Sequence, residues 1–159
     1  MAEGEVDFNL EEIMAFIPHR YPFLLIDRVI NAIADKSAVG VKAVTVNEPY
    51  FRGLPLKQLA MPGMLIVEAM AQTAAVVAIH TLGSEMAGKF IFLMGLHEVR
   101  FHHAVKPGDM LFLHTSKIRS HGPFSKVRGE AKVDGKLMAE ATMTAMILDA
   151  AEAFQVPKT

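Results

Sequence analysis

The sequence predicts an α+β fold in which an antiparallel sheet wraps around one long central helix. The helix covers residues 62–82, PGMLIVEAMAQTAAVVAIHTL, and because it is apolar on nearly every face it must be buried. Strand-like runs lie on both sides of it in the chain. In the last run, 136–148, small residues such as Ala139 and Ala141 alternate with polar ones, so one sheet face has room for a thick apolar object. The helix at 62–82 is that object.

Both ends of the central helix are marked. Pro62 suits the first helical turn, where a missing N–H costs nothing, and Gly83 is a residue that commonly closes a helix. Glu68 and Gln72 are four residues apart and therefore stack on one face. A carboxylate on a buried helix is either paired in the core or part of a site. A membrane span is disfavoured because a mid-helix glutamate is costly in lipid.

The other elements follow from caps, turn residues and periodicity. Asn9 with Glu12 three residues later has the pattern of a capping box and starts a short helix, Leu10–Phe16, which Pro18 ends. The remaining expectations are a turn at 18–23, strands at 26–34 and 38–46, a structured loop at 47–61, and strands at 89–95, 97–105, 109–121, 124–133 and 136–148.

Composition limits the class of protein. The chain has 159 residues, 52% of them hydrophobic, which suits one domain spanning 1–159 with a sizeable core. A net charge of −1 argues against a general nucleic-acid binder, and the absence of cysteine excludes disulfides. The acidic N-terminal residues lack the apolar segment of a signal peptide, so we expect a cytoplasmic protein. No metal-ligand spacing or nucleotide motif is present, so we expect no cofactor.

Five stretches carry a resemblance to bacterial 3-hydroxyacyl-[acyl-carrier-protein] dehydratases of the FabZ type, which have the hotdog fold. Together they span nearly the whole chain, and PHRYPFLLIDRV and PGMLIVEAMAQ are the most specific parts. The resemblance implies a homodimer with joined sheets and sites at the subunit interface, often as a trimer of dimers. The stretches are IMAFIPHRYPFLLIDRV (13–29), NEPYFRG (47–53), PGMLIVEAMAQTA (62–74), VRFHHAVKPGDML (99–111) and RGEAKVDGKLMAEATMTAMI (128–147).

The resemblance also assigns site residues. Dehydration removes a proton from the carbon next to a thioester carbonyl and expels the 3-hydroxyl as water. Glu68 matches the family's acid, which works on the site of the other subunit, and Gly63 matches the glycine whose N–H binds the thioester oxygen. Phe92 matches the aromatic residue that guards the acyl tunnel, and Met64 and Gln72 are further substrate-binding candidates.

One departure from the family pattern affects the reaction itself. Leu54 stands where the family has its basic histidine, and Pro55 and Leu56 also differ from the motif, without insertion or deletion. A positioned general base typically contributes about 10² to 10⁴ in rate. A relocated base is therefore worth considering among the histidines near the other motifs, namely His19, His97, His102 and His103.

The expected partner is an acyl carrier protein bearing the thioester. Carrier proteins of this kind are strongly acidic, so a cationic patch on the dehydratase is expected near the tunnel mouth. The alternative is an ordinary solvated strand face. The candidate residues are Arg100, His102, His103, Lys106, Lys126 and Arg128.

Three functions remain open at this point. The first is dehydration of (3R)-hydroxyacyl carrier-protein thioesters, and the second is a non-catalytic acyl-carrier-binding subunit paired with a paralogue that supplies the histidine. The third is a thioesterase in which Glu68 activates water. Leu54 counts against the first, while retention of Glu68 counts against an abandoned site. The extent of the match elsewhere places the dehydratase first.

Overall fold

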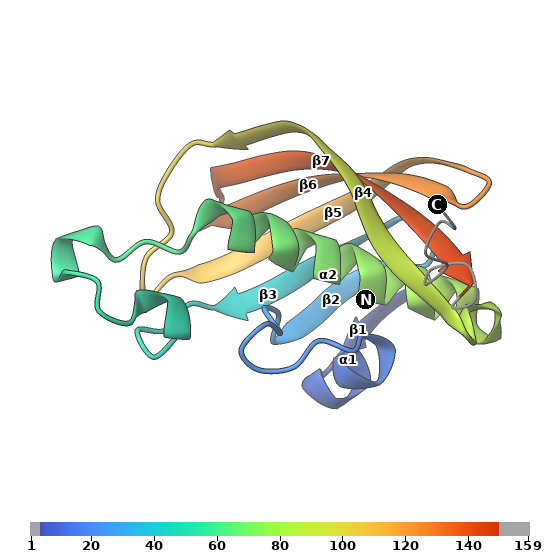
Figure 1. Ribbon diagram of the computed structural model, residues 1–159, viewed down its shortest axis with the longest axis horizontal. Helices are drawn as coiled ribbons and strands as arrows, with labels where there is room; N and C mark the ends of the chain where they lie inside the picture. The colour runs from blue at the N-terminus through green and yellow to red at the C-terminus, as the bar shows by residue number, and fades with distance from the viewer. Residues whose placement is uncertain (1–3, 150–159) are drawn as a thin grey trace, which may run out of the picture.

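A computed structural model of the chain describes residues 4–149 and has an antiparallel sheet curved around a long helix (Figure 1). Within these residues the strand order is β1-β2-β3-β5-β6-β7-β4, and every neighbouring pair is antiparallel. The elements are β1 (Glu5–Phe8), α1 (Leu10–Phe16), β2 (Arg28–Ile33), β3 (Ser37–Ala43), η1 (Pro49–Phe51), η2 (Leu56–Gln58), α2 (Gly63–Leu82), η3 (Gly83–Met86), β4 (Lys89–Phe101), β5 (Met110–His121), β6 (Phe124–Val133) and β7 (Lys136–Asp149).

The short helix α1 has the capped start that its sequence predicts. The Glu12 N–H donates to Asn9 Oδ1 at 3.0 Å, and the Asn9 N–H donates to Glu12 Oε2 at 2.8 Å. Both bonds satisfy donors that a helix start leaves unpaired. Ile13 is fully buried beneath the helix, so the cap also fixes how α1 sits on the core.

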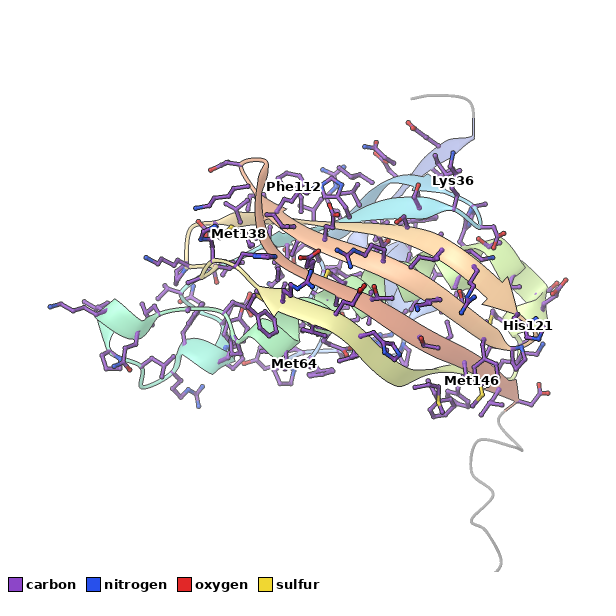
Figure 2. All side chains as sticks on the ribbon, turned by 90° about the horizontal axis from the view of Figure 1, so that it is seen from above. Lys36, Met64, Phe112, His121, Met138 and Met146 are labelled. Atoms are coloured by element: carbon purple, nitrogen blue, oxygen red, sulfur yellow. The ribbon has the colours of Figure 1, made fainter. Side chains whose placement is uncertain are left out.

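The central helix α2 is held closely by the sheet. Figure 2 looks onto the sheet from above, with β7 running from Met138 at one end to Met146 at the other. Two glycines allow the strands to approach the helix. A Cβ on Gly40 would lie 2.1 Å from Thr73 Oγ1, and one on Gly129 would lie 2.6 Å from Met70 Sδ. Both distances are shorter than van der Waals contact, so a larger residue at either position would force Thr73 or Met70 to shift.

The stretch Gly63–Met86 has the length and hydropathy of a membrane span by composition. In the described part of the chain it is the core helix instead. Ile66, Val67, Met70 and Val76 of α2 are each at most 2% exposed, packed beneath β3, β5, β6 and β7. The side of the helix that faces the sheet is therefore buried by the fold itself.

Two expectations about strands need correction. The runs 89–95 and 97–105 form one strand, β4, which ends at Phe101. Its pairing with β7 shifts register between Leu93 and Gly95 and between His97 and Arg100, so irregularities interrupt the pattern without ending the strand. The N-terminal strand β1 is missing from the predicted elements because its sequence EVDF is only four residues long, and among residues 4–149 it pairs with β2 alone.

Candidate active site

A cavity of about 790 Å³ opens between α2, the segment 14–23, and the inner sides of β4 and β7. This volume falls in the usual range of about 300–1,000 Å³ for small-molecule sites. Phe92 and Met143 contribute to its mostly apolar wall, and His19, Glu68 and Gln72 bring polar groups together on one part of it. Phe92, the predicted tunnel residue, therefore lines this cavity.

Gln72 is the tie between α2 and the turn that precedes β2. Its side chain is 1% exposed, and its Nε2 donates to the Phe23 carbonyl at 2.7 Å and to Glu68 Oε1 at 2.9 Å. Its Oε1 accepts a bond of 2.9 Å from the Leu25 N–H. The predicted contact between Gln72 and a substrate would therefore compete with these three hydrogen bonds. The effect that the structure shows is that the Gln72 side chain positions Glu68.

Arg20 fixes the turn from its other side. Its Nη2 donates to the Met14 carbonyl at 2.9 Å, while Nη1 donates to the carbonyls of Ile17 at 2.9 Å and His19 at 2.7 Å. Carbonyls at a helix C-terminus lack intrahelical partners, and a cation is favourable there. The guanidinium therefore closes α1 and sets the backbone position of His19.

His19 lies beside Glu68 in the cavity. Its Nε2 is 3.4 Å from Glu68 Oε1, and the two side chains are 29% and 23% exposed. The imidazole is stacked on the Phe23 ring at a centroid distance of 6.1 Å. Its Nδ1 is buried and has no hydrogen-bond partner in the described part of the chain. Of the four histidines considered as relocated bases, His19 is the one that lies beside the Glu68 carboxylate in the described structure. The two residues are far apart in sequence, so no local motif indicates this contact.

Leu54, which stands at the position of the family histidine, lies outside the cavity that contains Glu68 of its own chain. Leu54 is 40% exposed and belongs to the 47–61 segment, which projects from the end of the molecule where α2 begins (Figure 1). His97 and His103 are exposed, and neither contacts Glu68 within residues 4–149.

The start of α2 is accessible but also lies outside the lining of this cavity. A Cβ on Gly63 would be 2.5 Å from Cε1 of Phe101, so this glycine is required by the close approach of the ring. Met64 is 54% exposed. The first N–H groups of a helix have no intrahelical acceptor, so Gly63 keeps a donor for a ligand oxygen.

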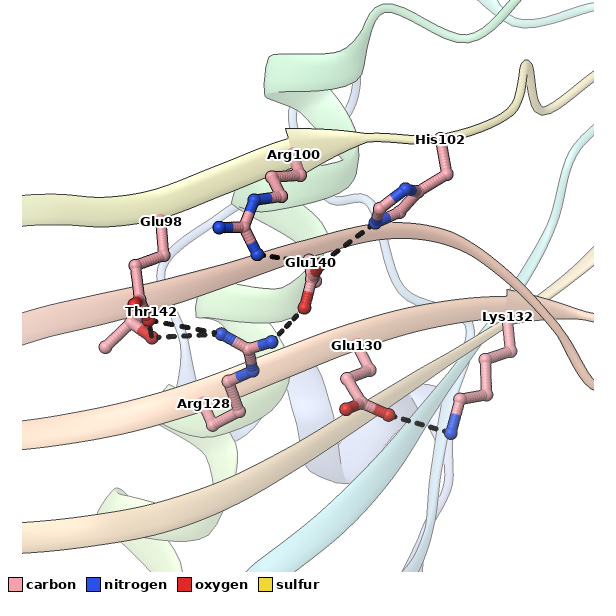
Figure 3. A network of polar contacts seen from close by, with 8 residues as sticks. All are labelled: Glu98, Arg100, His102, Arg128, Glu130, Lys132, Glu140 and Thr142. Atoms are coloured by element: carbon pink, nitrogen blue, oxygen red, sulfur yellow. Dashed lines mark hydrogen bonds and ion pairs between the residues drawn. The ribbon is translucent and has the colours of Figure 1, made fainter.

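The predicted carrier-binding cations divide into two groups. On the sheet face turned away from α2, Glu140 is bound by Arg128, by His102 Nε2 at 2.9 Å and by Arg100 Nη1 at 3.6 Å (Figure 3). Arg128 also lies 3.5 Å from Glu98. The hydrogen bond with His102, together with the charge of Arg128, lowers the pKa of the Glu140 carboxyl. Two arginines face two glutamates here, so this cluster has no net charge while His102 is neutral.

The second group consists of the predicted cations outside that cluster. His103 follows β4, Lys106 lies in the turn before β5, and Lys126 lies on β6. No ion pair involves any of them among residues 4–149. These three side chains are the ones left to meet an acidic partner.

An antiparallel sheet wrapped around a long apolar helix is the architecture of the hotdog class. Solved structures agree. The dehydratase heterocomplex ApeI:P from Xenorhabdus doucetiae matches with a TM-score of 0.77 and 20% identity over 92% of this chain and 97% of that chain. A hot-dog-like protein from Thermanaerovibrio acidaminovorans matches with a TM-score of 0.62 and 17% identity, over 77% of this chain and 93% of that one. At these identities the likeness concerns the fold.

The family is shown by sequence. The FabA-like domain family matches residues 17–142. The 3-hydroxyacyl-[acyl-carrier-protein] dehydratase FabZ of Paramagnetospirillum magneticum is 52% identical over 89% of this chain and 88% of its own length. The FabZ of Rhodospirillum rubrum is 50% identical over the same shares. The chain therefore belongs to the FabZ-type 3-hydroxyacyl-[acyl-carrier-protein] dehydratase family.

Proposed function

We propose that this protein removes water from (3R)-hydroxyacyl thioesters of an acyl carrier protein, in cytoplasmic fatty acid synthesis. The observation that carries the proposal is the Glu68 carboxylate, which Gln72 holds on the wall of an apolar cavity of about 790 Å³. The apolar wall around Phe92 suits an acyl chain, and the carboxyl group suits protonation of a leaving hydroxyl. Family membership supports the same reaction.

The complete site needs two copies of the chain. Gly63 and Glu68 are five residues apart on one helix, roughly 7.5 Å along its axis, and Gly63 does not line the cavity that contains Glu68. Neither does Leu54. A donor for the thioester oxygen at Gly63 therefore comes from a second copy, as the family resemblance implies. Such donors act where negative charge develops during removal of the proton from carbon 2.

The edge strand β4 supports this assembly. It has one neighbour in the sheet, β7, and exposes Leu93 and Met94 at 45% and 54%. Met64, at the start of α2, is also 54% exposed. An unpaired edge with apolar side chains is a template for pairing with another chain. We propose that β4 pairs with β4 of a second copy, and that such dimers assemble further into a trimer of dimers.

The proposed docking contact for the carrier protein is formed by His103 and Lys106, which lie together at the Met138 end of the sheet, whereas Lys126 lies opposite Thr144, farther along β7. These side chains have no intramolecular ion pair in the described region, so an acidic partner would not have to displace a carboxylate. Cations of this kind act mainly on the association rate. Reversal of His103 and Lys106 to glutamate should raise the KM for a carrier-protein thioester and leave kcat for a small thioester unchanged.

A non-catalytic binding subunit is the second candidate, and Leu54 is the observation that favours it. Spectrophotometric assay of crotonyl and 3-hydroxybutyryl thioesters separates the two. Turnover by the wild-type protein that is lost in Glu68→Gln, and retained in the remote control His121→Gln, supports the dehydratase. An inactive wild-type protein that gains activity on Leu54→His supports the binding subunit.

A further inference from the structure

The two oxygens of Glu68 have different surroundings. Oε1 accepts the 2.9 Å hydrogen bond from Gln72 and lies 3.4 Å from His19 Nε2. Oε2 has no partner among residues 4–149. Since Glu68 lines the cavity, Oε2 is the oxygen left for a bound molecule.

The surroundings of His19 decide which of its nitrogens carries the proton. Nδ1 is buried without a partner, so a proton on Nδ1 would be a buried donor left unpaired, which is costly. The neutral ring avoids this cost when Nε2 carries the proton and Nδ1 has only its lone pair. In that tautomer Nε2 is a donor aimed at a carboxylate and has no lone pair with which to take a proton. The 3.4 Å contact exceeds the usual N–H···O range of about 2.7–3.2 Å, but contacts in a free enzyme often tighten in the substrate complex.

We infer that Glu68 carries out both proton transfers of the dehydration, and that His19 is a positioning residue that donates from Nε2 to Oε1 and does not act as the base. This inference rests on the proposed function and deepens it. It supplies the base that Leu54 cannot supply, without a second titrating residue.

The step balances with one carboxylate. Oε2 takes the proton from carbon 2, and the electron pair of that C–H bond becomes the double bond between carbons 2 and 3. The bond from carbon 3 to the hydroxyl oxygen breaks, and its electron pair stays on the oxygen. The proton on Oε2 passes to this oxygen, water leaves, and Glu68 is again a carboxylate. No oxidant, reductant or further acid is consumed.

Two substitutions at His19 separate a donor from a base. Glutamine keeps an N–H at about the reach of Nε2 but has no basic nitrogen, whereas alanine removes both. We expect His19→Gln to stay within about threefold of wild-type kcat and His19→Ala to lose about 10- to 100-fold, the effect of one hydrogen bond to a charged group. If His19 were the base, both variants would lose about 10²- to 10⁴-fold, which overturns the inference. His121→Gln, on the far hairpin, is the control and should match the wild type.

A pH profile adds a readout that loss of structure would not mimic. We expect kcat/KM of the wild type and of His19→Gln to have the same shape against pH, because the same carboxyl group serves as base and acid in both. Disappearance of a limb in His19→Gln would overturn the inference.

A measurement without substrate keeps this inference separate from the proposed function. Long-range proton–nitrogen NMR correlations, assigned with His19→Gln, report the tautomer of His19. A proton on Nε2 and a bare Nδ1 support the positioning role, and a proton on Nδ1 overturns it. If the wild-type protein turns over no thioester, the proposed function and the two proton transfers assigned to Glu68 are both refuted. The NMR measurement of the His19 tautomer still tests separately whether Nε2 donates to Glu68.

Discussion

Replacement of Gln72 by methionine should destabilise the protein and misplace Glu68 together. Gln72 is 1% exposed and makes three hydrogen bonds, to the Phe23 carbonyl, the Leu25 N–H and Glu68 Oε1. Methionine has a similar length and volume and is flexible, so the change removes the polar contacts without opening a large cavity. The loss of unfolding free energy therefore comes from the backbone groups of Phe23 and Leu25, which lose their hydrogen bonds to Gln72.

The magnitude follows from the surroundings of those partners. Leu25 is 1% exposed, so its N–H would be left buried and unpaired at about 1–3 kcal/mol. Phe23 is 47% exposed, so water can replace part of its lost bond, and the Phe23 carbonyl adds about 1 kcal/mol or less. We expect a total loss of about 1–4 kcal/mol of unfolding free energy. For a chain of this size, that lowers Tm by roughly 2–16 °C.

Urea unfolding followed by far-UV circular dichroism measures this loss, with wild type and variant at the same protomer concentration. Gln58→Met is the matched control, because Gln58 is exposed in η2 and should stay within about 0.5 kcal/mol of the wild type. A Gln72→Met protein as stable as this control would refute the reasoning that Gln72 ties the 18–25 turn to α2. Thioester turnover on the same samples should fall even where the protein is fully folded.

Three other substitutions test the packing and charge of the fold. Gly40→Ala should lower the unfolding free energy by about 1–3 kcal/mol because its Cβ meets Thr73. In a Thr73→Ala background part of this loss should be recovered. Strict additivity of the two substitutions would contradict the contact. The lowered pKa of Glu140, caused first by His102, adds stability that is present above its ordinary value of 4.5 and is lost as the pH falls through the lowered folded value. Glu140→Gln should therefore lower the urea midpoint at pH 7 and flatten its decline in acid, and an unchanged decline would contradict this. Asn9→Ala should lower unfolding free energy by about 1 kcal/mol through loss of the capping box, and an unchanged urea midpoint would show that the cap is dispensable.

The elements that sequence predicts well are those fixed by local chemistry. The helix α1 matches the expected bounds because Asn9 and Glu12 form its cap. The helix α2 begins one residue after Pro62 and ends at Leu82, where Gly83 forms the C-cap with a φ of 52° that suits glycine. The last hairpin turns at Asp134 and Gly135 with φ values of 49° and 77°, as that dipeptide indicates.

The strands that sequence predicts poorly depend on their neighbours. The segment 5–8 alternates polar and apolar residues over only four positions, too short a pattern to predict a strand, and it becomes β1 because β2 offers it a partner. The strand β4 continues through Glu98, which has a φ of 51°, because pairing with β7 resumes at Arg100. Neither result follows from a local pattern, since tertiary pairing decides both.

The site shows the same division. Residue types and the family resemblance identify Glu68, but they give no sign that His19 lies beside it. That contact exists because Gln72 binds the backbone of the 18–25 turn. Likewise the sequence shows cations at Arg100, His102 and Arg128, whereas their pairing with Glu140 depends on the registry of β4, β6 and β7.

The placement of Glu68 also explains how this fold can accept leucine at position 54. Every polar contact found for the carboxylate in the described chain comes from α2 or from the 18–25 turn, and none comes from the 47–61 segment. Replacement of that loop can therefore remove a base without moving the carboxylate or closing the cavity. The contacts that hold Glu68 come from α2 and the 18–25 turn and are separate from the loop, so the loop can differ while the position of Glu68 is kept.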